Sequence, residues 1–199
     1  MQSCRTDAEG GLNSFVEEQK KHPGEAVYTL VQFNTNYEFV HKAMPIKDVP
    51  KFTLQPSGGT ALLDAIGRAI IETGDRLKAM PEDQRPGLVV FVILTDGEEN
   101  SSREFTREKI KEMIEHQTTQ YKWQFTYLGA NQDAFAVGGS MGIPMAASAG
   151  YTTDKVSAAF AGTGGNVARM RTASATGKSV VNAYTPDEIK AMAPSSEKP

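Results

Sequence analysis

Two short motifs carry the oxygen-bearing side chains best suited to chemistry in this sequence. Ser57-Gly-Gly-Thr60 places a hydroxyl in front of a helical pattern, and Thr95-Asp96-Gly97 places a carboxylate directly after the most hydrophobic segment. Hydroxyl and carboxylate oxygens are hard ligands that suit Mg²⁺, Mn²⁺ or Ca²⁺ better than zinc or copper. The two motifs therefore predict part of a divalent-metal site with Thr60 and Asp96 as its ligands, provided that the fold brings them together.

The apolar patterns around these motifs predict an α/β domain. Residues 62–77 carry apolar side chains at helical spacing. The continuously apolar run Leu88–Leu94 is typical of a strand that helices cover on both faces, so we expect a central strand there. Segments 26–33 and 37–44 predict a hairpin. Because loops at the carboxyl ends of parallel strands gather at one edge of an open sheet, both motifs are expected at the same rim.

The remaining elements follow the same alternation. Further helices are expected at residues 6–21, 106–118 and 133–141, further strands at 123–128 and 145–149, and a last helix capped by Thr153. From Thr172 onward Ser, Thr, Ala, Pro and Lys dominate. We therefore expect one domain over residues 1–171 and a largely disordered tail over residues 172–199, in which Thr185-Pro-Asp-Glu188 has the spacing of a short capped helix.

Composition and charge narrow the possible functions. With 199 residues and 39% apolar content, the chain can bury one good core. Its 21 basic and 24 acidic residues are interspersed, which argues against nucleic acid as a partner. The longest apolar run, Leu88–Leu94, is too short to span a membrane, and Cys4 as the single cysteine favours a reducing compartment. We therefore expect a cytoplasmic protein.

The two motifs also resemble a known family. Ser57-Gly-Gly-Thr60-Ala-Leu and Ile93-Leu-Thr-Asp96-Gly, about three dozen residues apart, resemble the von Willebrand factor type A domain. Tyr127-Leu-Gly-Ala-Asn131 and the helix around Phe160 are similar to cytosolic bacterial and phage members of that family. The resemblance spans residues 1 to about 171. It implies a three-layer, doubly wound, Rossmann-like sheet that is mostly parallel, with one antiparallel edge strand from the hairpin.

The resemblance further implies a function. In that family a metal-ion-dependent adhesion site combines an Asp-x-Ser-x-Ser loop with a threonine and an aspartate, and the metal accepts an acidic group from a protein partner. Thr60 and Asp96 match the second and third elements. By resemblance, the chain is a non-catalytic protein-interaction module with part of an Mg²⁺, Mn²⁺ or Ca²⁺ site.

One element of the family pattern has no counterpart in the sequence. By resemblance, the chain begins just after the family's first strand and the loop that follows it, so the Asp-x-Ser-x-Ser loop is missing. Ser3 is a less favoured substitute, because its register places it after that loop. We expect weak or absent metal binding and, since the first strand lies at the centre of the family's sheet, two inner strand edges without a neighbour.

Simpler interpretations of the site residues stay open. Thr60 alone fits a helix cap, and Asp96 followed by glycine fits an ordinary turn. Asp64 fits an acid that stabilises the positive end of a helix, with support of the metal loop as the lesser possibility. Glu98 and Glu99 fit solvated surface charges.

Other functions at the same rim also stay open. The alternatives are a small α/β nucleotide-binding or hydrolytic domain and a metal-free scaffold. Gly138-Gly-Ser140-Met-Gly142 has the spacing of a hydrolase nucleophile elbow, but it follows an expected helix, and no histidine comes after His116. The sequence therefore implies no reaction.

Overall fold

Helices and strands alternate along the chain in the order that the sequence predicts. The computed structural model describes residues 5–54, 58–130 and 133–193. Its helices are α1 (Arg5–Lys21), α2 (Leu62–Ala79), α3 (Arg107–Tyr121), α4 (Ala134–Ser140), α5 (Val156–Ala175) and α6 (Pro186–Met192). Its strands are β1 (Val27–Phe33), β2 (Tyr37–Pro45), β3 (Val90–Thr95), β4 (Gln124–Ala130) and β5 (Ser148–Tyr151). Short 3-10 turns lie at Ile46–Asp48, Glu82–Gln84, Met145–Ala147 and Thr153–Lys155.

The strands form two sheets, and in the described residues β1 has a neighbour only in β2 and β3 only in β4, which agrees with the expected pair of unpaired inner edges. β1 and β2 make an antiparallel hairpin, and β3, β4 and β5 make a parallel sheet in that order. The middle strand is therefore β4, and β3 is an edge strand of its sheet, so the expectation that Leu88–Leu94 is central was wrong for the described residues. The α/β class is confirmed, and the arrangement is compatible with a type A-like fold.

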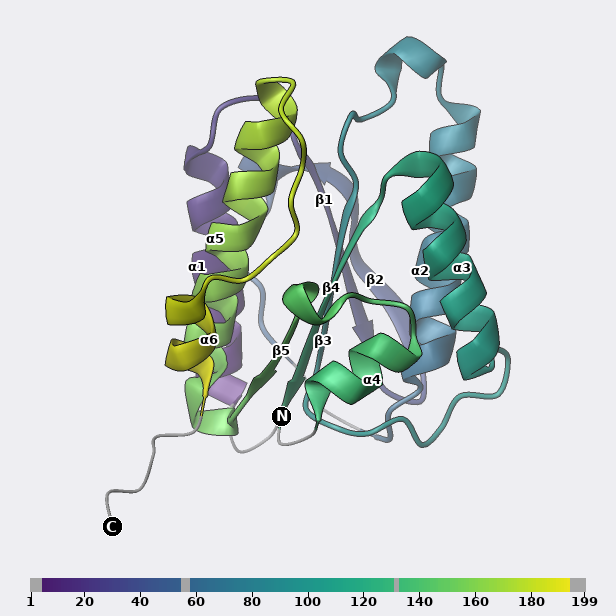
Figure 1. The fold of residues 1–199 in the computed structure, drawn as a ribbon, viewed down its shortest axis with the longest axis vertical. Coiled ribbons are helices and arrows are strands. Elements are labelled where there is room, and N and C mark those ends of the chain that lie inside the picture. The colour runs from purple at the N-terminus through teal and green to yellow at the C-terminus, as the bar shows by residue number, and fades with distance from the viewer. Residues whose placement is uncertain (1–4, 55–57, 131–132, 194–199) are drawn as a thin grey trace.

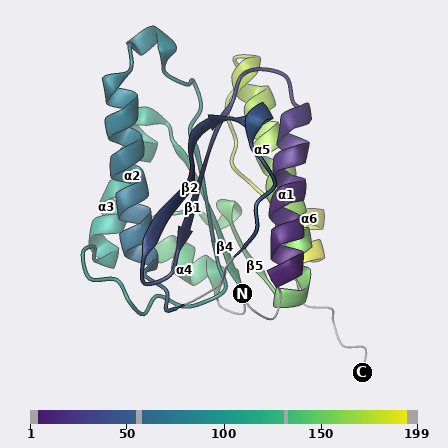
Figure 2. The same cartoon turned by 180° about the vertical axis from the view of Figure 1, so that it is seen from behind.

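Two layers of helices enclose the strands. Figure 1 shows α1, α5 and α6 on one side and α2, α3 and α4 on the other, with the strands between them. The same arrangement is seen from behind, with the hairpin in front (Figure 2). Side chains of β4 alternate between the layers: Phe125 and Tyr127 belong to the core under α2 and α3, and Leu128 and Ala130 to the core under α1 and α5. The strand is therefore buried on both faces.

Helix α1 packs closely along α5. A Cβ placed on Gly11 would lie 2.6 Å from Cδ2 of Phe160, so only glycine allows this approach. The Gln19 side chain donates a hydrogen bond to the Gly164 carbonyl over 3.0 Å, and Arg171 donates to the Gln19 carbonyl over 2.7 Å. These contacts join residues far apart in the sequence and fix the first helix to the domain.

Residues 172–193 are folded onto the domain, so the expectation of a disordered tail was wrong for them. α5 continues to Ala175, and α6 begins with the capping box of Thr185 and Glu188. The Glu188 carboxylate also binds Arg169 of α5 through two hydrogen bonds of 2.7 and 2.8 Å. Tyr184 and Met192 are buried in the core under α1 and α5, which gives this polar segment its apolar anchors.

Smaller differences concern the ends of elements. Met145–Ala147 is a 3-10 turn, and β5 follows it, so the expected strand at 145–149 is shifted. Thr153 lies inside a 3-10 turn and does not cap α5. In the described part of the chain, no helix is long and apolar enough to cross a membrane.

We expect Met192→Ala to lower the free energy of unfolding by about 2–5 kcal/mol, because it removes a fully buried side chain and leaves a cavity. Urea unfolding followed by circular dichroism measures the change. Lys190→Ala, on the exposed side of the same helix, is the matched control and should change stability by less than about 0.5 kcal/mol. Equal stability of all three proteins would mean that α6 is not docked.

Candidate functional site

The structure brings the two predicted motifs together. The Asn100 backbone N–H donates to the Thr60 carbonyl over 3.1 Å, and the Thr60 backbone N–H donates to Oδ1 of Asn100 over 2.9 Å. A Cβ placed on Gly97 would lie 2.8 Å from Oγ1 of Thr60, so the threonine hydroxyl contacts the residue next to Asp96. The loop before α2 and the loop after β3 therefore share one rim, at the carboxyl end of β3 (Figure 1).

The two glycines of the first motif have separate roles. Gly58 has a φ of 76°, a left-handed conformation that glycine adopts without strain. Gly59 has no room for a side chain, because a Cβ there would collide with Oγ of Ser101 and lie 3.0 Å from Oδ1 of Asn100. The pair is therefore needed for the close approach of the two loops.

The turn after β3 is built by a threonine. The Thr95 hydroxyl donates to the Gly97 carbonyl over 2.8 Å, and the Gly97 N–H donates back to the same hydroxyl oxygen over 3.2 Å. The Tyr151 hydroxyl of β5 donates to the Thr95 carbonyl over 3.4 Å. These bonds hold the half-buried Asp96 at the end of the strand.

Thr60 is not the cap of α2, which removes the simplest structural interpretation of this residue. The N-cap is Ala61, whose side chain cannot accept a hydrogen bond. The first amides of the helix are instead satisfied by the opposite loop: Leu63 donates to Oε2 of Glu99 over 2.9 Å, and Asp64 donates to Oγ of Ser102 over 3.1 Å. The cap of α2 is therefore supplied by the loop that carries Asp96.

Glu99 is a structural clamp, so the interpretation of it as a solvated charge was wrong. Besides the Leu63 amide, its carboxylate accepts the backbone N–H groups of Ser101 and Ser102 over 2.9 and 2.8 Å. It also accepts the Ser102 hydroxyl over 2.7 Å. Its neighbour Glu98 is exposed, as expected.

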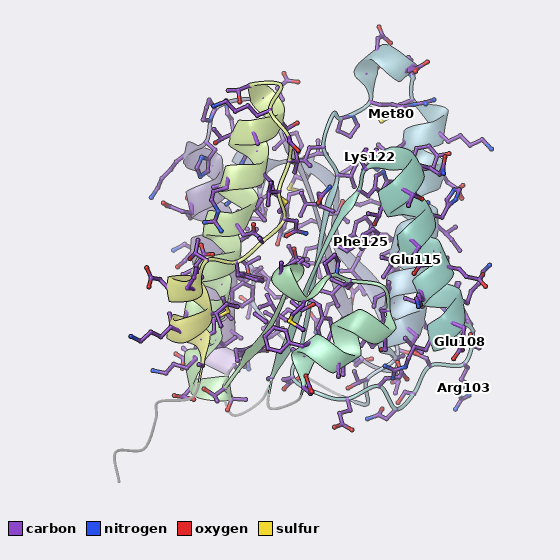
Figure 3. The ribbon with its side chains drawn as sticks, in the orientation of Figure 1. Met80, Arg103, Glu108, Glu115, Lys122 and Phe125 are labelled. Atoms are coloured by element: carbon purple, nitrogen blue, oxygen red, sulfur yellow. The ribbon has the colours of Figure 1, made fainter. Side chains whose placement is uncertain are left out.

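Asp64 supports the same loop from the other side. Its carboxylate accepts three backbone N–H groups, from Arg103 and Glu104 over 2.9 Å each and from Phe105 over 3.0 Å. Figure 3 shows Arg103 at the end of the molecule where α3 begins. These contacts agree with the less favoured of the two roles that the sequence suggested for Asp64, namely support of the loop after β3.

Both clamping carboxylates are stabilised in their charged form. Burial raises the pKa of Asp64, but the three backbone hydrogen bonds outweigh it, so the pKa lies below its ordinary value. Burial likewise raises the pKa of Glu99, and the hydrogen bonds from Ser102, Leu63 and Ser101 together lower it below its ordinary value. Both groups are therefore anionic at neutral pH and lock the rim.

The described residues do not by themselves complete a metal site. A divalent cation of this kind takes about six oxygen ligands. Thr60 and Asp96 offer a hydroxyl and a carboxylate, while the nearby carboxylates of Asp64 and Glu99 are bound to backbone amides. Within residues 5–54, 58–130 and 133–193, no three His, Cys, Asp or Glu side chains gather as a metal-binding group. Ser3, Cys4 and Ser57 lie outside the described residues.

Three residues important to the site were not predicted from the sequence. Asn100 and Ser102 accept hydrogen bonds from Thr60 and Asp64 across the two loops, and Ser101 donates to Oδ1 of Asn100 within its own loop. The polar run from Glu99 to Ser102, directly after a strand and its turn, was the available signal. Polar residues in such runs are usually solvated, so the pattern alone did not distinguish them.

Comparisons with protein-family models and with curated proteins gave no match. The likeness to the von Willebrand factor type A domain therefore stays a prediction from the two motifs.

We expect Asp64→Asn to lower the free energy of unfolding by about 1–3 kcal/mol at neutral pH, because an amide replaces a buried carboxylate that accepts three backbone hydrogen bonds. The pKa of Asp64 is lower in the folded chain than in the unfolded one, so its contribution is present above about pH 4 and is lost as the pH falls through the folded pKa. Urea unfolding of both proteins at a series of pH values measures the difference.

Glu98→Gln is the control for this experiment, because Glu98 is an exposed carboxylate in the same loop. It should leave stability within about 0.5 kcal/mol at each pH. A stability difference between Asp64→Asn and the unsubstituted chain that stays constant down to low pH would contradict the assigned role of the carboxylate.

Proposed function

We propose that the chain is a non-catalytic protein-interaction domain of the von Willebrand factor A type. It binds its partner at the rim formed by residues 58–60 and 96–100. The observation that carries the proposal is the reciprocal hydrogen bonding of Thr60 and Asn100, which holds the Thr60 hydroxyl against the residue beside Asp96. The resemblance assigns metal-ligand roles to the same two residues, and chemistry favours Mg²⁺, Mn²⁺ or Ca²⁺ for their oxygens.

Metal binding by this chain alone is weak under this proposal. Two side-chain oxygens leave most coordination positions to water, so affinity should be in the millimolar range or weaker, on the order of the weakest protein calcium sites. An acidic side chain of a partner would add charge and a further oxygen. The rim is therefore proposed as a docking surface for an acidic protein segment.

The structure offers no support for a nucleotide at this rim. Phosphates bind the unpaired amides at a helix N-terminus, usually where a glycine-rich loop joins a strand to the helix. Here the amides of Leu63 and Asp64 are bound by Glu99 and Ser102. In the described part of the chain before the glycines, the last strand is β2, which ends at Pro45.

We expect Mn²⁺ titrated into the ¹⁵N-labelled chain to broaden the amide signals of Thr60, Asp96 and Gly97 before those of other residues, because the paramagnetic ion acts over short distances. Two-dimensional NMR spectra measure the effect. In Asp96→Asn, which keeps the shape of the side chain and removes its charge, this selective broadening should disappear. In Glu98→Gln, the matched control on the same loop, it should persist. Selective broadening that survives in Asp96→Asn would contradict Asp96 as a ligand.

We also expect the peptide Gly-Asp-Gly, with blocked ends, to shift the amide signals of Gly97 and Asn100 only when Mg²⁺ is in excess, because its carboxylate completes the coordination of the ion. Spectra with and without Mg²⁺ test this. The peptide Gly-Asn-Gly should have no effect, and Thr60→Val should abolish the response to Gly-Asp-Gly. Equal shifts with both peptides would remove the metal from the proposed mechanism.

A further inference from the structure

A groove lies between α2 and α3 and opens to solvent. Figures 1 and 2 show the two helices side by side, with no described helix or strand outside them. The lining includes Ile71, Gly74 and Asp75 of α2 and Lys109, Met113 and His116 of α3. The groove therefore combines apolar side chains with charged groups of both signs.

Two residues of α2 give this groove a knob and a hole. Ile71 is 46% exposed, although Ile70 beside it is 2% exposed. Gly74, one turn later, has no side chain, and a Cβ placed on it would meet no atom within 4 Å. A glycine inside a helix costs about 1 kcal/mol relative to alanine, and no packing contact in the described chain requires one here. The α2 surface therefore carries a protruding apolar side chain beside an empty position.

The apolar surface continues along α3. Met113 packs against the core from a partly buried position. The rings of His116 and Tyr121 lie edge to face, with 5.7 Å between their centroids, and Tyr121 is 62% exposed. Methionine and tyrosine are enriched in protein interfaces, and neighbouring exposed apolar groups mark binding surfaces more often than single ones do. The outer side of the α2 and α3 layer is therefore suited to binding a protein.

The charged groups at the groove are available to a partner. Asp75 is exposed and makes no ion pair with the described residues. Lys109 is paired with Glu112 over 3.2 Å, but both side chains are more than half exposed, and such surface pairs contribute little. The groove therefore offers an acid and a base that a partner of matching charge could bind.

The relative level of the two helices fixes where this base lies. Phe105 packs against α2 at Gly67, where an added Cβ would lie 2.7 Å from the phenyl ring. Both helices begin at the same end of the molecule and run in the same direction (Figure 1). Lys109 follows Phe105 by four residues, as Ile71 follows Gly67. Lys109 therefore lies near the level of Ile71.

We propose that two copies of the chain associate through α2 and α3 about a two-fold axis, with their α2 helices antiparallel. An axis between Ile71 and Gly74 places Ile71 of each copy over Gly74 of the other. Asp75 then lies at the level of residue 70 of the second copy, beside Lys109 there. A two-fold interface must be complementary to itself, and this surface supplies both knob and hole and both acid and base.

This arrangement leaves the proposed rim open. Because α2 begins beside Thr60 and the two copies are antiparallel, the two rims lie at opposite ends of the dimer. Each rim therefore stays accessible to its own partner. The dimer does not depend on metal or partner binding at the rim.

Sedimentation velocity over a range of protein concentrations tests the proposal. We expect the mass to rise from 21.6 kDa toward twice that value. The dissociation constant should be in the micromolar range, because the surface is small.

Gly74→Leu separates the interface from the stability of the fold. It fills the hole, so dimerisation should weaken about tenfold or more. The monomer should stay folded, because leucine favours helix more than glycine does and a Cβ at this position meets no other atom. Gly10→Leu is the matched control, since Gly10 is also a glycine inside a helix with nothing within 4 Å of an added Cβ. It should dimerise as the unsubstituted chain does.

A charge exchange tests the register of the two copies. Asp75→Lys and Lys109→Asp each place like charges opposite one another, so each should weaken the dimer about tenfold. The combination of both substitutions should restore most of the affinity, because opposite charges then face each other again. Val181→Lys, at a 66% exposed position outside α2 and α3, is the control and should leave dimerisation unchanged.

Three results would overturn the proposal. A mass of one chain at every concentration into the millimolar range would leave the groove to a different protein. A dimer that Gly74→Leu does not weaken would place the interface elsewhere on the chain. A combined charge variant as weak as the two single ones would exclude the contact between Asp75 and Lys109 and, with it, this two-fold arrangement.

Discussion

The amides at the start of α2 impose the constraint on which the rim depends. A helix begins with backbone N–H groups that have no partner within the helix, and Ala61 at the N-cap cannot accept from them. Glu99 and Ser102 accept from Leu63 and Asp64, so α2 can begin only where the loop after β3 reaches it. Asp64 then binds that loop in return. Thr60 and Gly97 therefore lie close together, because the start of α2 and the loop after β3 each supply hydrogen-bond partners that the other lacks.

The sequence predicted the elements well and the clamp poorly, for one physical reason. Helical and strand periodicity report which faces are buried, and these patterns located α2, β3 and the hairpin within a few residues. In the sequence, Glu99 is the same residue whether its carboxylate is solvated or accepts hydrogen bonds from the amides of a neighbouring loop. Only the approach of the two loops distinguishes these cases. The juxtaposition of the motifs was therefore predictable from sheet topology, but the residues that enforce it were not.

The C-terminal segment shows a related limit of composition. Residues 172–193 are rich in Ser, Thr, Ala and Lys, which is typical of disorder. Their fold depends on a few anchors, Tyr184 and Met192 in the core and the ion pair of Glu188 with Arg169. Glycines in α5, which weaken a helix by propensity, make room for these anchors: a Cβ on Gly162 would lie 2.8 Å from Cε of Met192. Packing of this kind has no signature in average composition.

The position of β3 also helps to build the rim. Its apolar run predicted a central strand, and this was wrong for the described residues. Apolar side chains indicate that both faces of a strand are buried, but they do not show whether both of its edges are paired. At its carboxyl end β3 leads into Asp96, and β1 leads into Asn34, whose carbonyl accepts the Ala61 amide over 2.8 Å. Both strands therefore end at the rim that holds Thr60.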